Sequence, residues 1–239
     1  MWLRFNPASD ALFLDIDGTL LDIAPTAEEV IVPPSLIKNL VQIQEKTGGA
    51  LAFLSGRPIT DIDPLFAPLR VPCAGVHGAE IRLSATGKIQ HAPALPDEFV
   101  ARIKRKLKGM EGLLLENKGP TLAVHYRKNS SIFKTLEASL QQELLQSHLP
   151  LTLLKGRKVI EIVSDRFSKG GALERLMALP TFKGRRPFFL GDDITDLSAI
   201  GACLKHGGVA ARVGGAIKDK SAFTSPQAVR DWLASMSRG

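Results

Sequence analysis

The sequence of 239 residues contains only two cysteines, Cys73 and Cys203. Two thiols can supply neither a disulfide framework nor a four-cysteine zinc site, so we expect both to be small core residues of a cytoplasmic protein. No apolar run approaches the roughly 18 residues that a membrane span requires. Acids at Asp10, Asp15 and Asp17 interrupt the stretch where a signal peptide would be apolar. We therefore expect no membrane partner.

Aromatic side chains are also scarce, at 6% of the residues with one tyrosine and two tryptophans. Proteins that bind single-stranded nucleic acid stack bases on such side chains, so the supply is thin for that function. Charge is plentiful, because 31 Lys and Arg residues against 24 Asp and Glu residues give a net charge of +7. A basic protein attracts nucleic acids, anionic surfaces and small anions alike, and the lack of aromatics favours a small anionic substrate.

Apolar runs alternate with helical segments over the first 80 residues, which predicts a parallel sheet with helices on both faces. The expected elements are strand 11–14, helix 33–48, strand 50–54, helix 59–66 and strand 71–76. The same alternation resumes further along, with a helix from Ser168 to about 178, a strand at 187–190, a helix from Asp193 and a last helix ending near Met236.

Between these two halves the pattern becomes that of a mixed α+β segment. After a hairpin at 81–90, we expect a basic helix at 96–108, strands at 112–116 and 121–127, a helix at 132–147 and strands at 151–154 and 158–163. We therefore predict an α/β protein with a Rossmann-like, doubly wound core formed by residues 1–91 and 167–239. Residues 92–166 would form a separate α+β domain inserted into it.

Two carboxylates follow the first predicted strand, in Asp15-Ile16-Asp17-Gly18-Thr19. Ligands of open α/β sheets bind at the carboxyl ends of strands, so Asp15 and Asp17 lie where a ligand is expected. Two buried acids this close need compensation, and a divalent cation is the obvious compensating group. Taken alone, a simple Asp-Gly turn explains the segment equally well.

A second acidic segment, Gly191-Asp192-Asp193 with Asp196, follows the predicted strand at 187–190. Asp192 and Asp196 are four residues apart and would share one face of a helix. Helix capping is the alternative, but a cap needs one acid and this segment has three. Acids at two strand ends indicate a Mg²⁺ site, because the five histidines show no zinc-ligand spacing.

Two more positions offer groups that bind anions. Ser55 follows the second strand, and Lys169 stands in Ser168-Lys169-Gly170-Gly171 at the start of a predicted helix, where free N–H groups attract phosphate. Helix capping would explain Ser55 on its own, and a Ser-Lys-Gly helix start by itself is weak evidence.

In this order, the four segments resemble the haloacid dehalogenase (HAD) superfamily of phosphohydrolases. The resemblance implies that Asp15 attacks phosphorus to form an aspartyl-phosphate and that Asp17 is the general acid and base. Ser55 and Lys169 would hold the transferring phosphoryl group.

The same resemblance implies a metal site for Mg²⁺. Its ligands would be Asp15, the backbone carbonyl of Asp17 and Asp192, with Asp196 supporting them.

The resemblance narrows to the trehalose-6-phosphate phosphatase family. The core segments that carry it are DIDGTLLDIAP (15–25), LSGRP (54–58) and GVHGAEIR (75–82), and those of the inserted domain are Glu116-Asn117-Lys118, AVHYR (123–127) and GRKVIEI (156–162). It implies a C2-type cap domain that closes over trehalose 6-phosphate. The implied substrate-binding residues are Arg57, Glu116, Lys118, Arg127, Arg157 and Glu161.

One residue departs from the family pattern, because Leu197 stands where the family usually has Glu after the last motif acid. The three acids of the last motif remain, so we expect metal binding to survive. How strictly the protein distinguishes between sugars is less certain without the glutamate. The alternative for the inserted domain is a salt-bridged sheet face, in which Glu116 and Lys118 pair with Arg127.

Three alternative functions remain open. The first is a related phosphatase for sucrose 6-phosphate or a glycosyl-phosphoglycerate. The second is nucleic-acid binding by the basic helix, through Arg102, Lys104, Arg105, Lys106 and Lys108, although these residues surround most of the helix and favour a solvated face. The third is a catalytically dead phosphatase, which the filled catalytic positions disfavour. We expect a monomer that binds a small sugar phosphate and no nucleic acid, and we assign His77 no catalytic role.

Overall fold

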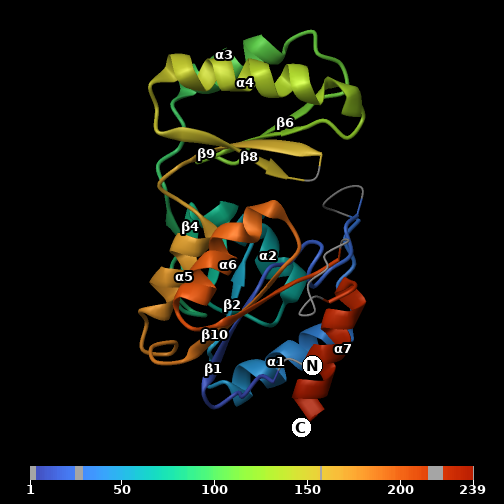
Figure 1. Ribbon diagram of the computed structural model, residues 1–239, viewed down its shortest axis with the longest axis vertical. Coiled ribbons are helices and arrows are strands. Elements are labelled where there is room, and N and C mark those ends of the chain that lie inside the picture. Colours follow the sequence, from blue (N-terminus) through green and yellow to red (C-terminus); the bar gives the residue numbers. More distant parts are fainter. Residues whose placement is uncertain (1–3, 25–28, 157, 215–222, 239) are drawn as a thin grey trace. The chain divides into compact units, whose positions relative to one another are not determined.

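The computed structural model describes residues 4–24, 29–156, 158–214 and 223–238 (Figure 1). The chain divides into two compact units. The core unit is formed by Met1–Gln90 and Ser168–Gly239, and the inserted unit by His91–Phe167.

A seven-stranded sheet forms the centre of the core unit, in the order β11-β10-β1-β2-β3-β4-β5. The five strands from β11 to β3 are parallel, and β4 runs antiparallel to β3. The strands are β1 (Asp10–Leu14), β2 (Leu51–Leu54), β3 (Cys73–Gly75), β4 (Glu80–Arg82), β5 (Gln90–His91), β10 (Arg186–Gly191) and β11 (Val209–Arg212).

Helices cover both faces of this sheet because alternate strand residues point to opposite sides. On one face, Leu12 and Leu14 pack in the cluster formed with α1 (Pro34–Lys46), α2 (Ile59–Phe66) and α7 (Pro226–Arg238). On the other face, Ala11 and Phe13 pack with α5 (Lys169–Met177) and α6 (Leu197–Lys205). Figure 1 shows α1 and α7 side by side on their face. Short 3₁₀ turns precede β4, at η1 (Val76–Gly78), and α6, at η3 (Ile194–Asp196).

The inserted unit is a four-stranded antiparallel sheet with helices on one face. Its strands, in the order β6-β7-β9-β8, are β6 (Leu114–Asn117), β7 (Leu122–His125), β9 (Val159–Ser164) and β8 (Leu151–Gly156). The helices are α3 (Asp97–Leu107) and α4 (Phe133–Ser147), the latter preceded by the 3₁₀ turn η2 (Ser130–Ile132). Leu122, Val124, Ile160 and Ile162 point to the helices and form one core with them. The opposite face carries the polar residues described below.

The structure confirms the predicted α/β core with an inserted α+β domain. It also contains one parallel strand that was not predicted, β11, which pairs with β10. Its sequence, Val-Ala-Ala-Arg, is short and half alanine, so it shows little of the β-branched pattern of a buried strand. None of the helices in the described ranges combines the length and hydropathy needed to cross a membrane.

Candidate active site

Asp15 stands at the centre of the site, directly after β1 and between the ends of β10 and β2. It is 4% exposed, and its N–H donates to the carbonyl of Leu190 at 2.9 Å. Lys169 Nζ donates to Asp15 Oδ1 at 2.6 Å, and the Thr19 hydroxyl donates to Asp15 Oδ2 at 3.1 Å. Both oxygens of this buried carboxylate are therefore oriented by side chains from the core unit. Thr19 belongs to the first motif, but its side-chain contact with Asp15 is not among the predicted roles.

Three carboxylates converge at this point. Asp15, Asp192 and Asp196 each offer an oxygen, and these oxygens lie within 4.8 Å of one another. Gly18 allows the Asp192 carboxylate to lie against the backbone of the first motif. Its φ of +79° suits glycine, and a Cβ atom at this position would overlap the Asp192 carboxylate. Clustered carboxylate oxygens are the donors that a hard divalent cation prefers, so the residues present fit Mg²⁺.

The second acidic segment, Asp192 to Asp196, does not form the α-helical turn that its spacing predicted. Asp192 lies just after β10, and Asp196 ends the 3₁₀ turn η3, so the two acids do not share an α-helical face. Asp193 caps the turn, with Oδ1 accepting from the Ile194 N–H at 2.6 Å. Asp196 Oδ2 accepts from the Asp193 N–H at 3.1 Å. Asp193 and Asp196 thus form a capping box, as the alternative of helix capping proposed, while Asp192 and Asp196 also place a carboxylate oxygen near Asp15.

Lys169 neutralises part of this negative charge. Its ammonium also donates to Asp196 Oδ1 at 2.5 Å, and the side chain is only 3% exposed. It is the first residue of α5, whose N-cap is Ser168, the hydroxyl of which accepts from the Gly171 N–H at 3.0 Å. Burial lowers the pKa of Lys169, but the carboxylates of Asp15 and Asp196 outweigh burial and raise it above its ordinary value.

Among the residues that the structure describes, one ammonium faces these three carboxylates, so negative charge is in excess there. Burial, followed by the nearby Asp196 and Asp192, raises the pKa of Asp15 well above its ordinary value, although Lys169 opposes the rise. Burial and the carboxylates of Asp196 and Asp193 likewise raise the pKa of Asp192 to about 7. Perturbed carboxyl groups at the ends of adjacent strands are typical of a functional site.

Asp17 points to a different partner. Arg57 binds it through two hydrogen bonds, from Nε to Oδ2 at 2.6 Å and from Nη2 to Oδ1 at 2.7 Å. Arg57 follows the buried Ser55, whose hydroxyl accepts from the Arg57 N–H at 3.1 Å. This turn after β2 therefore connects the predicted phosphate-binding serine with the predicted acid–base residue. The predicted substrate-binding role of Arg57 did not include this pairing.

The inserted unit presents two polar pairs on the sheet face opposite its helices. Lys118 Nζ donates to Glu161 Oε1 at 2.8 Å, with each side chain about 8% exposed. Glu116 Oε2 lies 2.9 Å from His125 Nε2. The hydrogen bond from His125 lowers the pKa of Glu116, and burial opposes this effect. Lys118 thus forms a salt bridge on this face, as in the alternative of a salt-bridged sheet face, with Glu161 as its partner.

Neither of the two arginines expected in sugar recognition, Arg127 and Arg157, lies in a described strand of this sheet. Arg127 is exposed in the turn after β7, and Arg157 lies outside the described residues.

In the basic helix α3, Arg102 and Lys106 approach Glu143 of α4 at 3.5 and 3.6 Å, whereas Lys104, Arg105 and Lys108 are exposed. Two of the five basic residues thus face an acid on the neighbouring helix.

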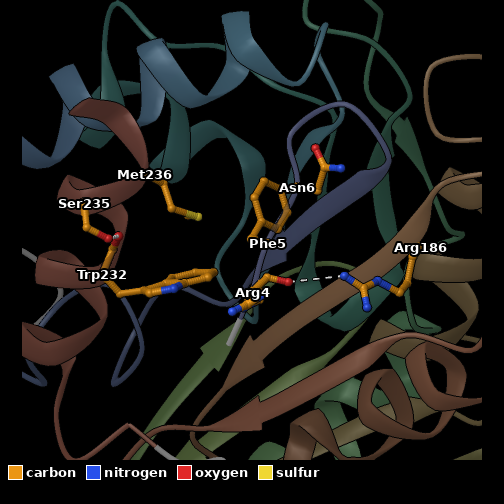
Figure 2. Close-up of a pocket in the computed structure, with 7 residues that line it drawn as sticks. All are labelled: Arg4, Phe5, Asn6, Arg186, Trp232, Ser235 and Met236. Atoms are coloured by element: carbon orange, nitrogen blue, oxygen red, sulfur yellow. Dashed lines mark hydrogen bonds between the residues drawn. The ribbon is translucent and has the colours of Figure 1, made fainter. Parts of the chain in front are cut away.

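A cavity of about 600 Å³ lies at the other end of the core strands (Figure 2). It is lined by Arg4, Phe5, Asn6, Arg186, Trp232, Ser235 and Met236. Arg186 begins β10, at the end opposite Asp192, and its guanidinium binds both carboxylate oxygens of Asp10 at 3.0 and 2.9 Å. The acid cluster, and not this cavity, therefore carries the chemistry that the motifs indicate.

Two solved structures of phosphatases share this fold. A phosphatase of the haloalkanoate (HAD) enzyme superfamily from Bacteroides thetaiotaomicron superimposes with a TM-score of 0.65 at 15% identity, covering 100% of this chain and 97% of that one. The C-terminal domain of trehalose-6-phosphate phosphatase from C. albicans gives a TM-score of 0.83 at 19% identity, covering 97% and 93%. At these identities the likeness establishes the fold alone, which this chain shares with those phosphatases.

Sequence comparison defines the family within that class. The family model for trehalose-phosphatase matches residues 13–227. A probable trehalose-phosphate phosphatase of Sinorhizobium fredii is 37% identical over 95% of this chain and 87% of its own length. Trehalose-6-phosphate phosphatase of Escherichia coli is 37% identical over 95% of this chain and 86% of its own length. The chain belongs to the trehalose-phosphatase family, as the motifs predicted.

Proposed function

We propose that this protein hydrolyses trehalose 6-phosphate to trehalose and inorganic phosphate through an aspartyl-phosphate on Asp15. The observation that carries the proposal is the burial of Asp15 at a strand end, where Lys169 and Thr19 orient its two oxygens. The family membership and the names of the relatives from Sinorhizobium fredii and Escherichia coli support the choice of substrate.

The first half of the reaction transfers the phosphoryl group to the protein. Asp15 attacks phosphorus through a carboxylate oxygen, and the bond from phosphorus to the sugar oxygen breaks. Asp17 gives a proton to the departing sugar oxygen. Lys169 and the Ser55 hydroxyl hold the oxygens of the transferring group and offset their charge. In the second half, Asp17 takes a proton from water as that water attacks the aspartyl-phosphate and releases Asp15.

A Mg²⁺ ion fits the acid cluster as the cofactor of this reaction. We assign its ligands to Asp15, Asp192 and the backbone carbonyl of Asp17. Both oxygens of Asp196 already accept hydrogen bonds, from Lys169 and from the Asp193 N–H. We therefore assign Asp196 the role of orienting these groups next to the metal ligands. When bound, the ion neutralises charge on the carboxylates and on the phosphoryl oxygens, which lets two anions approach.

Arg57 holds Asp17 by two hydrogen bonds, and we assign it the orientation of this acid–base group together with contact to the substrate. We assign sugar recognition to residues 92–166 as a cap domain, through Glu116, Lys118, Arg127, Arg157 and Glu161. Carboxylates and charged donors bind sugar hydroxyls through strong hydrogen bonds, and smaller sugars leave these groups unpaired.

We further place the reaction in the cytoplasm. The two free thiols, Cys73 and Cys203, are buried, and burial raises the pKa of both, that of Cys203 to about 12. Such thiols are inert core groups, which suits a reducing compartment.

Phosphate release from a panel of sugar phosphates tests the proposal. The panel contains trehalose 6-phosphate, sucrose 6-phosphate, a glycosyl-phosphoglycerate and glucose 6-phosphate, each assayed with Mg²⁺ and with EDTA. We expect trehalose 6-phosphate to be preferred and Asp15→Asn to be inactive, while Asp61→Asn at an exposed position of α2 keeps full turnover. Equal rates for trehalose 6-phosphate and glucose 6-phosphate would exclude the assigned substrate. Substantial turnover by Asp15→Asn would exclude the covalent route.

A further inference from the structure

The polar face of the inserted sheet contains a histidine to which the proposed function assigns no role. In the strand register, Glu116 pairs with Ala123 and Ala123 pairs with Glu161, so these three side chains lie in a row across β6, β7 and β9. His125 is two residues beyond Ala123 on β7 and therefore points to the same face.

Ala123 explains how two polar pairs fit on this face. Its methyl group is the smallest side chain that a strand residue other than glycine can carry. Lys118, just after β6, reaches across β7 to Glu161 of β9 at 2.8 Å, and His125 of β7 contacts Glu116 of the adjacent β6 diagonally at 2.9 Å. The small Ala123 leaves room for the first contact, and the second follows from the reach of long side chains between diagonal neighbours on adjacent strands.

The contact between His125 and Glu116 is suited to fixing a carboxylate that must bind a ligand. Glu116 is 43% exposed and would otherwise sample several rotamers, whereas the imidazole of His125 is 25% exposed. The hydrogen bond from Nε2 to Oε2 restricts the carboxylate before a ligand arrives. Preorganised groups bind more tightly because less freedom is lost on binding.

We propose that His125 is a positioning residue for sugar recognition, which holds the Glu116 carboxylate in the orientation that accepts hydrogen bonds from hydroxyl groups of the substrate's sugar. This proposal rests on the proposed function of the inserted unit. His125 acts through Glu116 and has no part in phosphoryl transfer.

Kinetics of His125 variants test the proposal with two substrates. Trehalose 6-phosphate engages the sugar-binding face, whereas p-nitrophenyl phosphate has no sugar and depends only on the core residues. We expect His125→Leu to raise KM for trehalose 6-phosphate about 10- to 100-fold, as expected for losing a hydrogen bond to a charged group. Its kcat, and its turnover of p-nitrophenyl phosphate, should stay within about twofold of wild type on the same reasoning. His206→Leu, at an exposed position after α6, is the matched control and should change neither.

Two further variants separate positioning from a structural role. In His125→Gln the side-chain amide can still donate to Glu116, so most of the lost affinity should return. In the Glu116→Ala background, His125→Leu should add little to KM, because its partner is already absent. An equal additional loss in that background, or no recovery with glutamine, would overturn the proposal.

The outcomes also distinguish this proposal from the assigned function. A wild type that hydrolyses p-nitrophenyl phosphate and ignores trehalose 6-phosphate would refute the substrate and, with it, the role of His125. A wild type that hydrolyses trehalose 6-phosphate with the same KM as His125→Leu would refute the positioning role alone.

Discussion

Replacing Asp192 by asparagine should stabilise the metal-free protein at neutral pH and remove its response to Mg²⁺. The reason lies in the pKa of Asp192, which burial and the carboxylates of Asp196 and Asp193 raise from 3.8 to about 7. A raised carboxyl pKa means that the folded protein holds the proton more tightly than the unfolded chain does. The stability contribution of Asp192 is therefore complete below pH 4 and is lost as the pH rises through 7.

The size of this loss follows from the pKa difference. A difference of one in pKa corresponds to about 1.4 kcal/mol, so a rise from 3.8 to about 7 costs roughly 4 kcal/mol above pH 7. Water at the partly exposed side chain screens some of this, which leaves about 2–3 kcal/mol. For a chain of this length, that difference corresponds to about 5–10 °C in Tm. The asparagine variant carries no ionisable group at this position and avoids the loss.

Thermal unfolding at pH 4.5 and pH 8 measures the effect. In EDTA at pH 8 the variant should melt at the higher temperature, and at pH 4.5 the two proteins should be within about 2 °C by the same conversion. Wild type should gain about 2.7 kcal/mol when Mg²⁺ is at 100 times its Kd, whereas the variant should gain little. Asp231→Asn, at an exposed position of α7, is the control. A variant that is less stable than wild type at pH 8 would contradict the raised pKa of Asp192, and one that gains as much from Mg²⁺ would exclude Asp192 as a metal ligand.

Three other substitutions test neighbouring parts of the site. Gly18→Ala should destabilise the protein by about 2–4 kcal/mol in urea unfolding, because its positive φ and its contact with the Asp192 carboxylate leave no room for a methyl group; unchanged stability would contradict this. Lys169→Met should reduce turnover by about 10³-fold or more and destabilise by about 3–5 kcal/mol, since it leaves two buried carboxylates without their cation. A stable, active Lys169→Met protein would remove that role. In Arg57→Lys the ammonium cannot reproduce the two hydrogen bonds that the guanidinium makes to Asp17. Hydrolysis of trehalose 6-phosphate should slow about 10- to 100-fold. The effect on p-nitrophenyl phosphate should be smaller, because its leaving group needs little protonation. Equal losses on both substrates would argue against an acid–base role for the pair.

The arrangement of the core could be predicted because buried parallel strands have a strong signal. Runs such as Phe13-Leu14 and Phe188-Phe189-Leu190 mark β1 and β10, and chemical groups that follow such strands meet at one edge of the sheet. This rule accounts for the expectation that Asp15 and Asp192 lie together. The strand β11 escaped prediction because Ala210 and Ala211 fit a helix or a turn as readily as a strand.

Contacts between side chains from different segments could not be predicted in the same way. Arg57 and Asp17 are 40 residues apart, and nothing in their local sequence says that they form a two-hydrogen-bond pair. The pairing of His125 with Glu116 depends on the register of β6 against β7, which periodicity alone does not fix. In the second acidic segment, spacing suggested a helix face, but the chain forms a 3₁₀ turn that Asp193 caps.

The proposed function is tested most directly by the ratio of kcat/KM for trehalose 6-phosphate to that for glucose 6-phosphate, measured with Mg²⁺ and again in EDTA. We expect a ratio of at least about tenfold with Mg²⁺, because a phosphate on a single sugar leaves part of the sugar-binding face unpaired. We also expect EDTA to abolish turnover of both substrates, because the carboxylates then lack their neutralising cation. A ratio near one would exclude trehalose 6-phosphate as the substrate, and full activity in EDTA would exclude the Mg²⁺ site.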